Sequence, residues 1–175
     1  MKKLVVGITG SVAAYKMEEV IDKIKDEYDI RVVMTDKSTY FSSKEKFEKL
    51  TKKDVIINLF NQEALDTIHI DIIKESDALL IAPCSANTLN KISNGIADNA
   101  LTTMFLVADT NKVFIAPAMN TRMYNHPITQ QNIKKLNNLG IRFIDPRYAL
   151  LACGDEGIGA LASIEDIVKY IREAI

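Results

Sequence analysis

Short apolar runs alternate with amphipathic stretches along the whole chain, and this alternation restricts the fold more than any other feature of the sequence. Strands are expected at residues 4–8, 29–34, 55–57, 78–81, 113–116 and 142–144, and helices at 12–27, 44–51, 87–93, 99–108, 128–139 and 164–174. Strands that are apolar on both faces and separated by helices form a parallel sheet covered on both sides. We therefore expect an α/β fold, a three-layer Rossmann-like (flavodoxin-like) sandwich with a central parallel sheet, as a single domain over residues 1–175.

Charge and hydropathy exclude several classes of partner. The chain has 22 basic and 23 acidic side chains, so it has no overall attraction for nucleic acid or anionic membranes. No apolar run reaches the roughly 18 residues of a membrane span, and the N-terminus shows no cleavage site. We expect a cytoplasmic protein. Its two cysteines, Cys84 and Cys153, lack the spacing of zinc ligands, so free thiols and no bound metal are expected.

The segment GITGSVAAYK, residues 7–16, follows the first expected strand. Gly7 and Gly10 permit a tight turn and close backbone approach, and Ser11 can cap the next helix, whose free N–H groups and dipole suit a phosphate. The pattern GxGxxG is missing and no acidic ribose anchor ends the second strand, which favours a monophosphate over a dinucleotide. A glycine-rich turn that serves packing alone is the alternative.

Two further segments offer polar groups where a strand ends. Thr35 and Ser38 follow the second strand, where they either contact the same ligand or only start a helix. PCSANT, residues 83–88, places Ser85, Asn87 and Thr88 at one helix N-terminus, which suits a phosphate or the edge of a flavin ring. Helix capping explains one of these three side chains but not all of them. The adjacent Cys84 is interpreted as a small buried hydrophobe without a role.

The segment APAMNTRMYNHP, residues 116–127, begins at the end of another strand. Asn120 can donate its amide hydrogens to a carboxylate, and neighbouring methionines provide soft apolar walls. An Asx-turn beside core methionines is the alternative. Further on, the glycine-rich segment LLACGDEGIGAL, residues 150–161, is typical of a mobile loop that closes over a substrate. Within it Cys153, protonated at neutral pH, can donate a proton, unless it is an inert surface thiol.

His69 is one of only two histidines and lies among isoleucines in LDTIHIDI, residues 65–72. The flanking residues are compatible with a buried, structural imidazole. An imidazole is also the natural base for a thiol or carboxylic acid substrate at neutral pH. The position of His69 between a weak strand and a strong one does not separate the two interpretations.

Taken in order, GITGSVAAYK, His69, PCSANT, PAMNTRMY and LACGDEG resemble the motifs of the flavin-containing cysteine decarboxylases, and the resemblance covers essentially the whole chain. Cys84 replaces the alanine of the family's PASANT motif, and GIGAL stands where many members have an arginine. The similarity is strongest to the members that act on 4'-phosphopantothenoylcysteine. It implies a carboxy-lyase of coenzyme A biosynthesis that uses FMN to convert this substrate into 4'-phosphopantetheine.

The resemblance also implies a role for each motif. His69 would be the catalytic base, Asn120 the ligand of the substrate carboxylate and Cys153 the proton donor. FMN would be held by Gly10, Ser11, Thr35, Ser38, Ser85, Ala86, Asn87, Thr88 and Ala118. The substrate would contact Asn120, Ala152, Cys153, Gly154 and Asp155.

The same resemblance implies a homo-oligomer, either a trimer or a dodecamer built from trimers, with sites at subunit boundaries. The sequence itself offers only the apolar residues 68–73 as a candidate interface, and these could equally be core. The pathway partner would be a separate phosphopantothenate-cysteine ligase.

Three other functions share parts of this pattern. A peptidyl-cysteine decarboxylase that modifies a precursor peptide shares the flavin site and the asparagine motif. A flavin prenyltransferase would lack PAMN and the cysteine of LACGDEG. An FMN-binding electron carrier would account for GITGS and PCSANT but not for His69, Asn120 and Cys153.

Overall fold

The computed structural model describes residues 1–59 and 68–175, apart from the side chains of residues 68 and 69. Its central sheet has five parallel strands in the order β2-β1-β3-β4-β5. The strands are β1 (Lys2–Ile8), β2 (Tyr28–Met34), β3 (Ala78–Cys84), β4 (Val113–Pro117) and β5 (Arg142–Phe143). The expected α/β fold with a central parallel sheet is confirmed.

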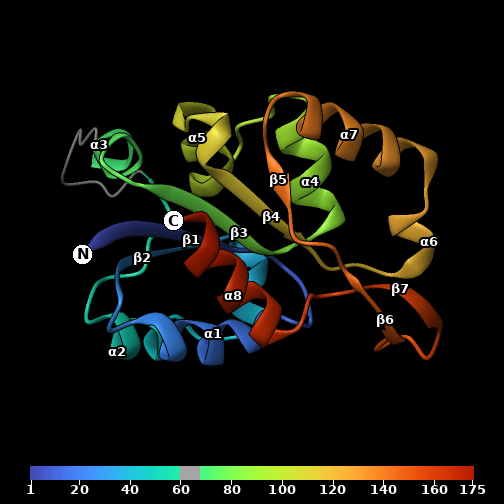
Figure 1. The fold of residues 1–175 in the computed structure, drawn as a ribbon, viewed down its shortest axis with the longest axis horizontal. Coiled ribbons are helices and arrows are strands. Elements are labelled where there is room, and N and C mark those ends of the chain that lie inside the picture. Colours follow the sequence, from blue (N-terminus) through green and yellow to red (C-terminus); the bar gives the residue numbers. More distant parts are fainter. Residues whose placement is uncertain (60–67) are drawn as a thin grey trace.

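Helices cover both faces of this sheet (Figure 1). One face packs against α1 (Lys16–Ile24), α2 (Lys44–Thr51) and α8 (Ile164–Ala174). The other packs against α3 (Ile68–Lys74), α4 (Ala86–Ser93), α5 (Ala100–Val107) and α7 (Pro127–Asn138). Side chains of the three central strands β1, β3 and β4 alternate between the two cores, as Leu4 and Val5 do in β1. The apolar character at both odd and even strand positions thus has a direct structural reason.

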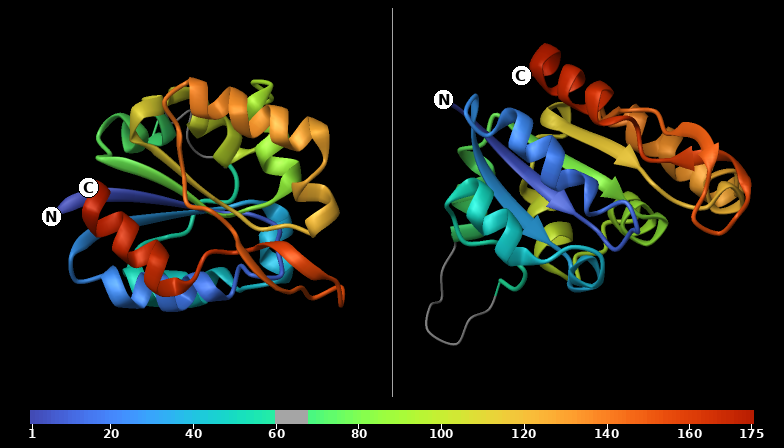
Figure 2. Two further views of the ribbon diagram at one scale, coloured as in Figure 1. Left: turned by 45° about the vertical axis from the view of Figure 1, so that its right-hand side comes forward. Right: turned by 90° about the horizontal axis from the view of Figure 1, so that it is seen from below.

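A two-stranded antiparallel hairpin extends beyond the sheet, as both views in Figure 2 show. It consists of β6 (Arg147–Leu150) and β7 (Glu156–Ala160). Residues 150–161 were expected to form a loop, and that expectation is wrong for Leu150 and Glu156–Ala160, which lie in strands. The glycines suggested a loop, but β7 uses two of them for close contact with a neighbouring segment, so only residues 151–155 form the turn.

Other boundaries also differ from expectation. Residues 55–57 form no strand and contribute one isolated bridge between Val33 and Ile56. The helix expected from residue 12 begins at Lys16, after a stretch of turns, and Asp36–Tyr40 form a short 3-10 helix, η1. Neither α3 nor the four-residue α6 (Thr121–Tyr124) was among the expected helices. Over residues 1–59 and 68–175, none of the helices has the length and apolar character needed to cross a membrane.

Candidate active site

A cavity of about 1060 Å³ opens at the carboxyl ends of the strands. Gly10 after β1, Thr35 after β2, Ser85 after β3 and Ala118 after β4 all line it, and the hairpin supplies a further wall. Parallel strands end at one edge of a sheet, which is where open α/β folds bind their ligands. Motifs that lie far apart in the sequence therefore meet in one place.

The turn after β1 approaches the segment after β2 closely at Gly10. A Cβ atom at Gly10 would lie 2.7 Å from Cβ of Lys37, so a side chain at this position would force the two loops apart. Ser11 follows, and its hydroxyl accepts a hydrogen bond from the amide of Ala13 at 3.3 Å. Residues 11–15 form turns and not a helix, so their amides are not all committed to helical hydrogen bonds.

The start of α4 is a well-ordered N-terminus that faces the cavity. Ser85 caps the helix, accepting from the amide of Thr88 at 3.3 Å. The amides of Ala86 and Asn87 have no acceptor among the described residues. Both N–H groups are therefore available to an anionic ligand, and the Ser85 hydroxyl, which donates to the Thr88 hydroxyl at 3.3 Å, would turn to reach the same ligand.

Thr9, which sequence reasoning missed, connects the ends of β1 and β3. Its fully buried hydroxyl donates to the carbonyl of Pro83 at 2.6 Å and accepts from the amide of Ser85 at 2.8 Å. The only signal in the sequence was a hydroxyl residue directly after an apolar strand. Thr9 fixes where α4 starts, and so where its free amides point.

The two hydroxyl residues after β2 are placed differently. Thr35 is buried and lines the cavity, whereas Ser38 is fully buried and does not line it. The hydroxyl of Ser38 donates to the carbonyl of Thr35 at 2.6 Å, which stabilises the first turn of η1. In this structure Ser38 acts through the position of Thr35 and not by facing the cavity.

Asn120 stands at the other side of the cavity, after β4. Its side chain caps α6, with Oδ1 accepting from the amide of Arg122 at 2.8 Å. The preceding residue, Met119, donates its amide to the carbonyl of Gly159 in β7 at 2.9 Å. The loop that carries Asn120 and the inner strand of the hairpin are therefore held together by their backbones.

The tip of the hairpin meets the Asn120 side chain. Nδ2 of Asn120 donates to Sγ of Cys153 at 3.0 Å and to Oδ2 of Asp155 at 3.1 Å. The Cys153 thiol in turn donates to Oδ2 of Asp155, with the two atoms 3.6 Å apart. The structure thus brings together the PAMN and ACGD motifs, which are more than 30 residues apart. The second thiol, Cys84, is buried, and burial raises its pKa.

Basic side chains also line the cavity: Lys16, Lys37, Lys91 and Arg147. Lys91 forms an ion pair with Asp98, and the hydrogen bond from Lys91 holds the pKa of the Asp98 carboxyl below its usual range. Nε of Arg147 donates to the carbonyl of Leu161 at 2.9 Å. Lys16 and Lys37 have no carboxylate partner within the described part of the chain, so they are free to meet an anionic ligand.

The predicted base, His69, belongs to helix α3, and its side chain lies outside the described residues. Figure 1 places α3 at one end of the molecule and α6 with the hairpin at the other. Within one chain, the helix that carries His69 is therefore remote from Asn120.

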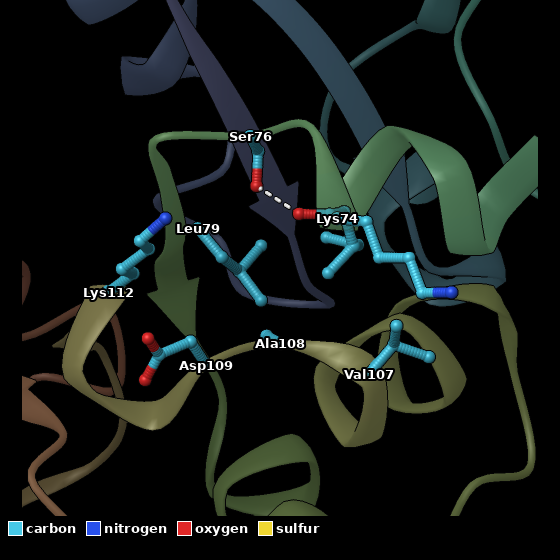
Figure 3. Close-up of a pocket in the computed structure, with 8 residues that line it drawn as sticks. Lys74, Ser76, Leu79, Val107, Ala108, Asp109 and Lys112 are labelled. Carbon is cyan, nitrogen blue, oxygen red and sulfur yellow. Dashed lines mark hydrogen bonds between the residues drawn. The ribbon is translucent and has the colours of Figure 1, made fainter.

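A second, smaller cavity of about 220 Å³ lies beside α3 and the end of α5 (Figure 3). Two of its polar side chains are already engaged: Ser76 donates to the carbonyl of Ile73 at 2.7 Å, and Asp109 caps the short 3-10 helix Thr110–Lys112. Lys74 and Lys112 point along its rim. None of the motif residues lies here, so the large cavity remains the candidate active site.

Comparisons with known proteins agree on one family. The family model described as Flavoprotein matches residues 1–175. A protein named "Probable phosphopantothenoylcysteine decarboxylase" from Streptococcus mutans serotype c is 39% identical over 177 residues, which cover 99% of each chain. The chain is thus similar along its whole length to a protein of that name.

Solved structures give the same result. A cysteine-to-serine mutant of PPC decarboxylase in complex with pantothenoylaminoethenethiol has a TM-score of 0.87 at 34% identity, covering 98% of this chain and 97% of that one. The FMN binding protein AtHal3 has a TM-score of 0.84 at 35% identity, covering 98% and 95%. The peptidyl-cysteine decarboxylase EpiD has a TM-score of 0.82 at 30% identity, covering 98% and 99%. The chain belongs to the flavoprotein family that contains the phosphopantothenoylcysteine decarboxylases.

Proposed function

We propose that this protein uses FMN to decarboxylate 4'-phosphopantothenoylcysteine to 4'-phosphopantetheine, a step of coenzyme A biosynthesis. One observation carries the proposal: an amide donor, a thiol and a carboxylate meet at about 3 Å across a cavity whose other side presents helix N-terminal donors. The name of the Streptococcus mutans relative supports the same reaction.

The residues of the cavity fit FMN. A phosphomonoester needs several donors, and the amides of Ala86 and Asn87 with the hydroxyls of Ser11, Ser85 and Thr88 form such a set. Asp36 and Asp98 also line the cavity, and the Asp98 carboxylate is paired with Lys91. The volume of about 1060 Å³ exceeds the roughly 300–1000 Å³ that holds a drug-sized ligand, which leaves room for a flavin with a substrate beside it. Gly10, Thr35 and Ala118 would complete the contact surface, with Ser38 supporting Thr35.

Loss of CO2 from a cysteine needs an electron sink that no side chain provides. FMN held by these residues would supply it through a reversible two-electron oxidation of the thiol-bearing carbon, with no net oxidation of the substrate. The chain's own residues would bind and orient the substrate and would donate the proton to the product.

Asn120 would hold the substrate carboxylate through Nδ2. Its neutral amide orients the carboxylate without the strong ionic stabilisation that would oppose departure of CO2. The bond from the Arg122 amide to Oδ1 fixes which end of the side chain faces the substrate. Ala152, Cys153, Gly154 and Asp155 at the hairpin tip would cover the substrate and exclude water.

Cys153 would supply the final proton. Its sulfur lies 3.0 Å from Nδ2 of Asn120, so it stands beside the position given to the departing carboxylate. A thiol at that position can donate its proton to the carbon that has lost CO2.

His69 would be the base for the initial oxidation, and it would come from a neighbouring copy of the chain. The separation of α3 from α6 in Figure 1 supports a homo-oligomer, trimer or dodecamer of trimers, with the site at a subunit boundary. The whole chain, residues 1–175, would act as one domain in the cytoplasm. A ligase that joins phosphopantothenate to cysteine would provide the substrate.

An assay with two substrates tests the proposal. We expect protein purified with bound FMN to release CO2 from 4'-phosphopantothenoylcysteine and to yield phosphopantetheine by mass spectrometry. A peptide ending in cysteine should not react; turnover of the peptide alone would instead identify a peptidyl-cysteine decarboxylase, as EpiD is named. Flavin binding without release of CO2 from either compound would favour an electron carrier.

A further inference from the structure

The Asp155 carboxylate accepts a hydrogen bond from Nδ2 of Asn120, the donor that the proposed function assigns to the substrate carboxylate. We propose that the Asp155 carboxylate is an internal stand-in for the substrate carboxylate: it holds the hairpin tip on Asn120 when no substrate is bound, and only a ligand with its own carboxylate displaces it. Asp155 would thus determine selectivity for carboxylate-bearing ligands. The inference rests on the proposed role of Asn120.

The Asn120 side chain can lie in only one orientation. Oδ1 accepts from the Arg122 amide at 2.8 Å, and a reversed carboxamide would point its NH2 group at that N–H donor. Nδ2 must therefore face the hairpin, where its acceptors are Asp155 and Cys153 at 3.1 and 3.0 Å. A substrate carboxylate that binds Nδ2 has to take the place of one of them.

The hairpin is attached to the rest of the fold differently at its base and at its tip. Its inner strand is held at the base, where the Met119 amide donates to the Gly159 carbonyl and glycines allow close contact. The tip is exposed, and its backbone bonds are local: the amides of Leu151 and Gly154 donate to the carbonyls of Asp155 and Leu151 at 2.8 and 2.9 Å. The two contacts with Asn120 are the only side-chain hydrogen bonds from tip to scaffold among the described residues. The tip can therefore be released while the base stays in place.

The substrate carboxylate and the Asp155 carboxylate compete for Nδ2 of Asn120. Two carboxylates at one amide repel each other, and only one can take the Nδ2 hydrogen that now goes to Asp155. An incoming carboxylate therefore exchanges with Asp155. When CO2 has left, the ligand has no carboxylate, and Nδ2 returns to Asp155. The Asp155 side chain would thus give way to the substrate carboxylate and favour release of the product.

Ligand binding tests the competition. The variant is Asp155→Ala, with Glu156→Ala as matched control, because Glu156 is an exposed acid of the same hairpin without a hydrogen bond to Asn120. The probes are 4'-phosphopantothenoylserine, in which oxygen replaces sulfur, and the same compound without its carboxylate. Calorimetry on the FMN-loaded proteins measures Kd for each pair.

We expect Asp155→Ala to bind the serine compound roughly 10-fold more tightly, the size of one charge-assisted hydrogen bond at an exposed site. The compound without a carboxylate should change less than about twofold, as should both compounds with Glu156→Ala. Weaker or unchanged binding of the serine compound to Asp155→Ala, or equal tightening for both compounds, would overturn the proposal.

Hydrogen exchange on the ligand-free protein provides a test that does not depend on the proposed function. We expect the amides of Leu151 and Gly154 to exchange several-fold faster in Asp155→Ala than in the wild type and in Glu156→Ala, because the tip has lost its attachment. Unchanged hydrogen exchange at these amides in Asp155→Ala would contradict the attachment of the tip by Asp155, even if both ligands bind. If neither compound binds the wild type but exchange does accelerate, the substrate assignment fails while the attachment of the tip by Asp155 stands.

Discussion

The two sides of the cavity are built in different ways. The side formed by the loops after β1, β2 and β3 rests on buried groups, such as Thr9, which joins two strand ends through hydrogen bonds of 2.6 and 2.8 Å. The side formed by the hairpin ends in exposed residues held by the Asn120 side chain. In Figure 2 the hairpin reaches beyond the body of the fold.

This difference separates two tasks. A cofactor that stays bound benefits from donors fixed by a buried scaffold, because little order has to be gained on binding. A substrate that enters and leaves in each cycle needs a cover that can open, and exposed segments with few contacts open at low free-energy cost. Substitutions on the two sides should therefore affect different steps.

The largest effect is expected for Asn120→Asp. Aspartate caps a helix as well as asparagine does, so α6 and the bound FMN should be retained. The new carboxylate would face both Asp155 and the substrate, and like charges brought together cost several kcal/mol. We expect kcat/KM to fall roughly 1000-fold, corresponding to about 4 kcal/mol. Retention of more than a tenth of the activity would contradict the role given to Asn120.

A pair of glycine substitutions separates the base of the hairpin from its tip. Gly159 has φ of +142°, and a Cβ there would lie 2.3 Å from the carbonyl oxygen of Met119, so Gly159→Ala should push β7 off the loop that carries Asn120. Gly154 has φ of +86° but open space around it, so Gly154→Ala should cost only about 1–2 kcal/mol of backbone strain.

We expect Gly159→Ala to lower kcat/KM roughly 100-fold, as misplacement of a positioning element by about 1 Å can do. Gly154→Ala should lower it less than about 10-fold, and both proteins should keep their flavin absorbance. Equal losses in the two variants, or loss of flavin from Gly159→Ala, would remove the distinction between the two sides of the cavity.

Two N-cap serines test the scaffold side. Ser85 caps α4 at the cavity, and Ser163 caps α8 away from it, accepting from the Asp166 amide at 3.0 Å. Each Ser→Ala variant should lose about 1 kcal/mol of unfolding free energy in urea denaturation. In titrations of apoprotein, only Ser85→Ala should bind FMN more weakly, by roughly 10-fold, because one donor is removed. A similar change in FMN affinity for Ser163→Ala would show that stability, and not contact, controls binding.

The smallest effect is expected for the reactivity of the two cysteines, Cys84 and Cys153, toward a thiol reagent. Burial raises the pKa of Cys84, whereas Cys153 is exposed. A thiol reagent at pH 8 should therefore modify Cys153 in the native protein and reach Cys84 only after unfolding, since the thiolate is the reactive form. Because the raised pKa belongs to the folded state, Cys84 should lower stability only as the pH rises above the ordinary pKa of a thiol. Rapid modification of both thiols in native protein would contradict this contrast.

The sequence was sufficient for the body of the fold because burial on both faces leaves a direct pattern. Leu4 and Val5 pack into opposite cores, so residues 4–8 of the first strand are all apolar, and β3 and β4 show the same pattern. The motifs that follow strands lie at one edge of the sheet, since parallel strands all end there. This part of the site follows from topology.

The hairpin could not be predicted in the same way. Its strands are stabilised by contacts with a distant segment, through the bond from Met119 to Gly159 and the packing of Gly157 against Thr121, and glycines in isolation indicate a loop. The contact between Asn120 and Asp155 depends on that hairpin, so no local pattern contained it. The buried position of Ser38 was hidden for a similar reason, because its hydroxyl is used within η1.

One measurement tests most directly the claim that the two sides perform successive steps: the product of the Cys153→Ser variant. A hydroxyl, with a pKa far above the thiol's roughly 8.5, is a poor proton donor to the intermediate that has lost CO2. Mass spectrometry of 4'-phosphopantothenoylcysteine incubated with FMN-loaded Cys153→Ser should show a compound that lacks CO2 and is two hydrogens lighter than phosphopantetheine. Normal phosphopantetheine formed at the wild-type rate would show that Cys153 is only a surface thiol and would contradict the division of the site.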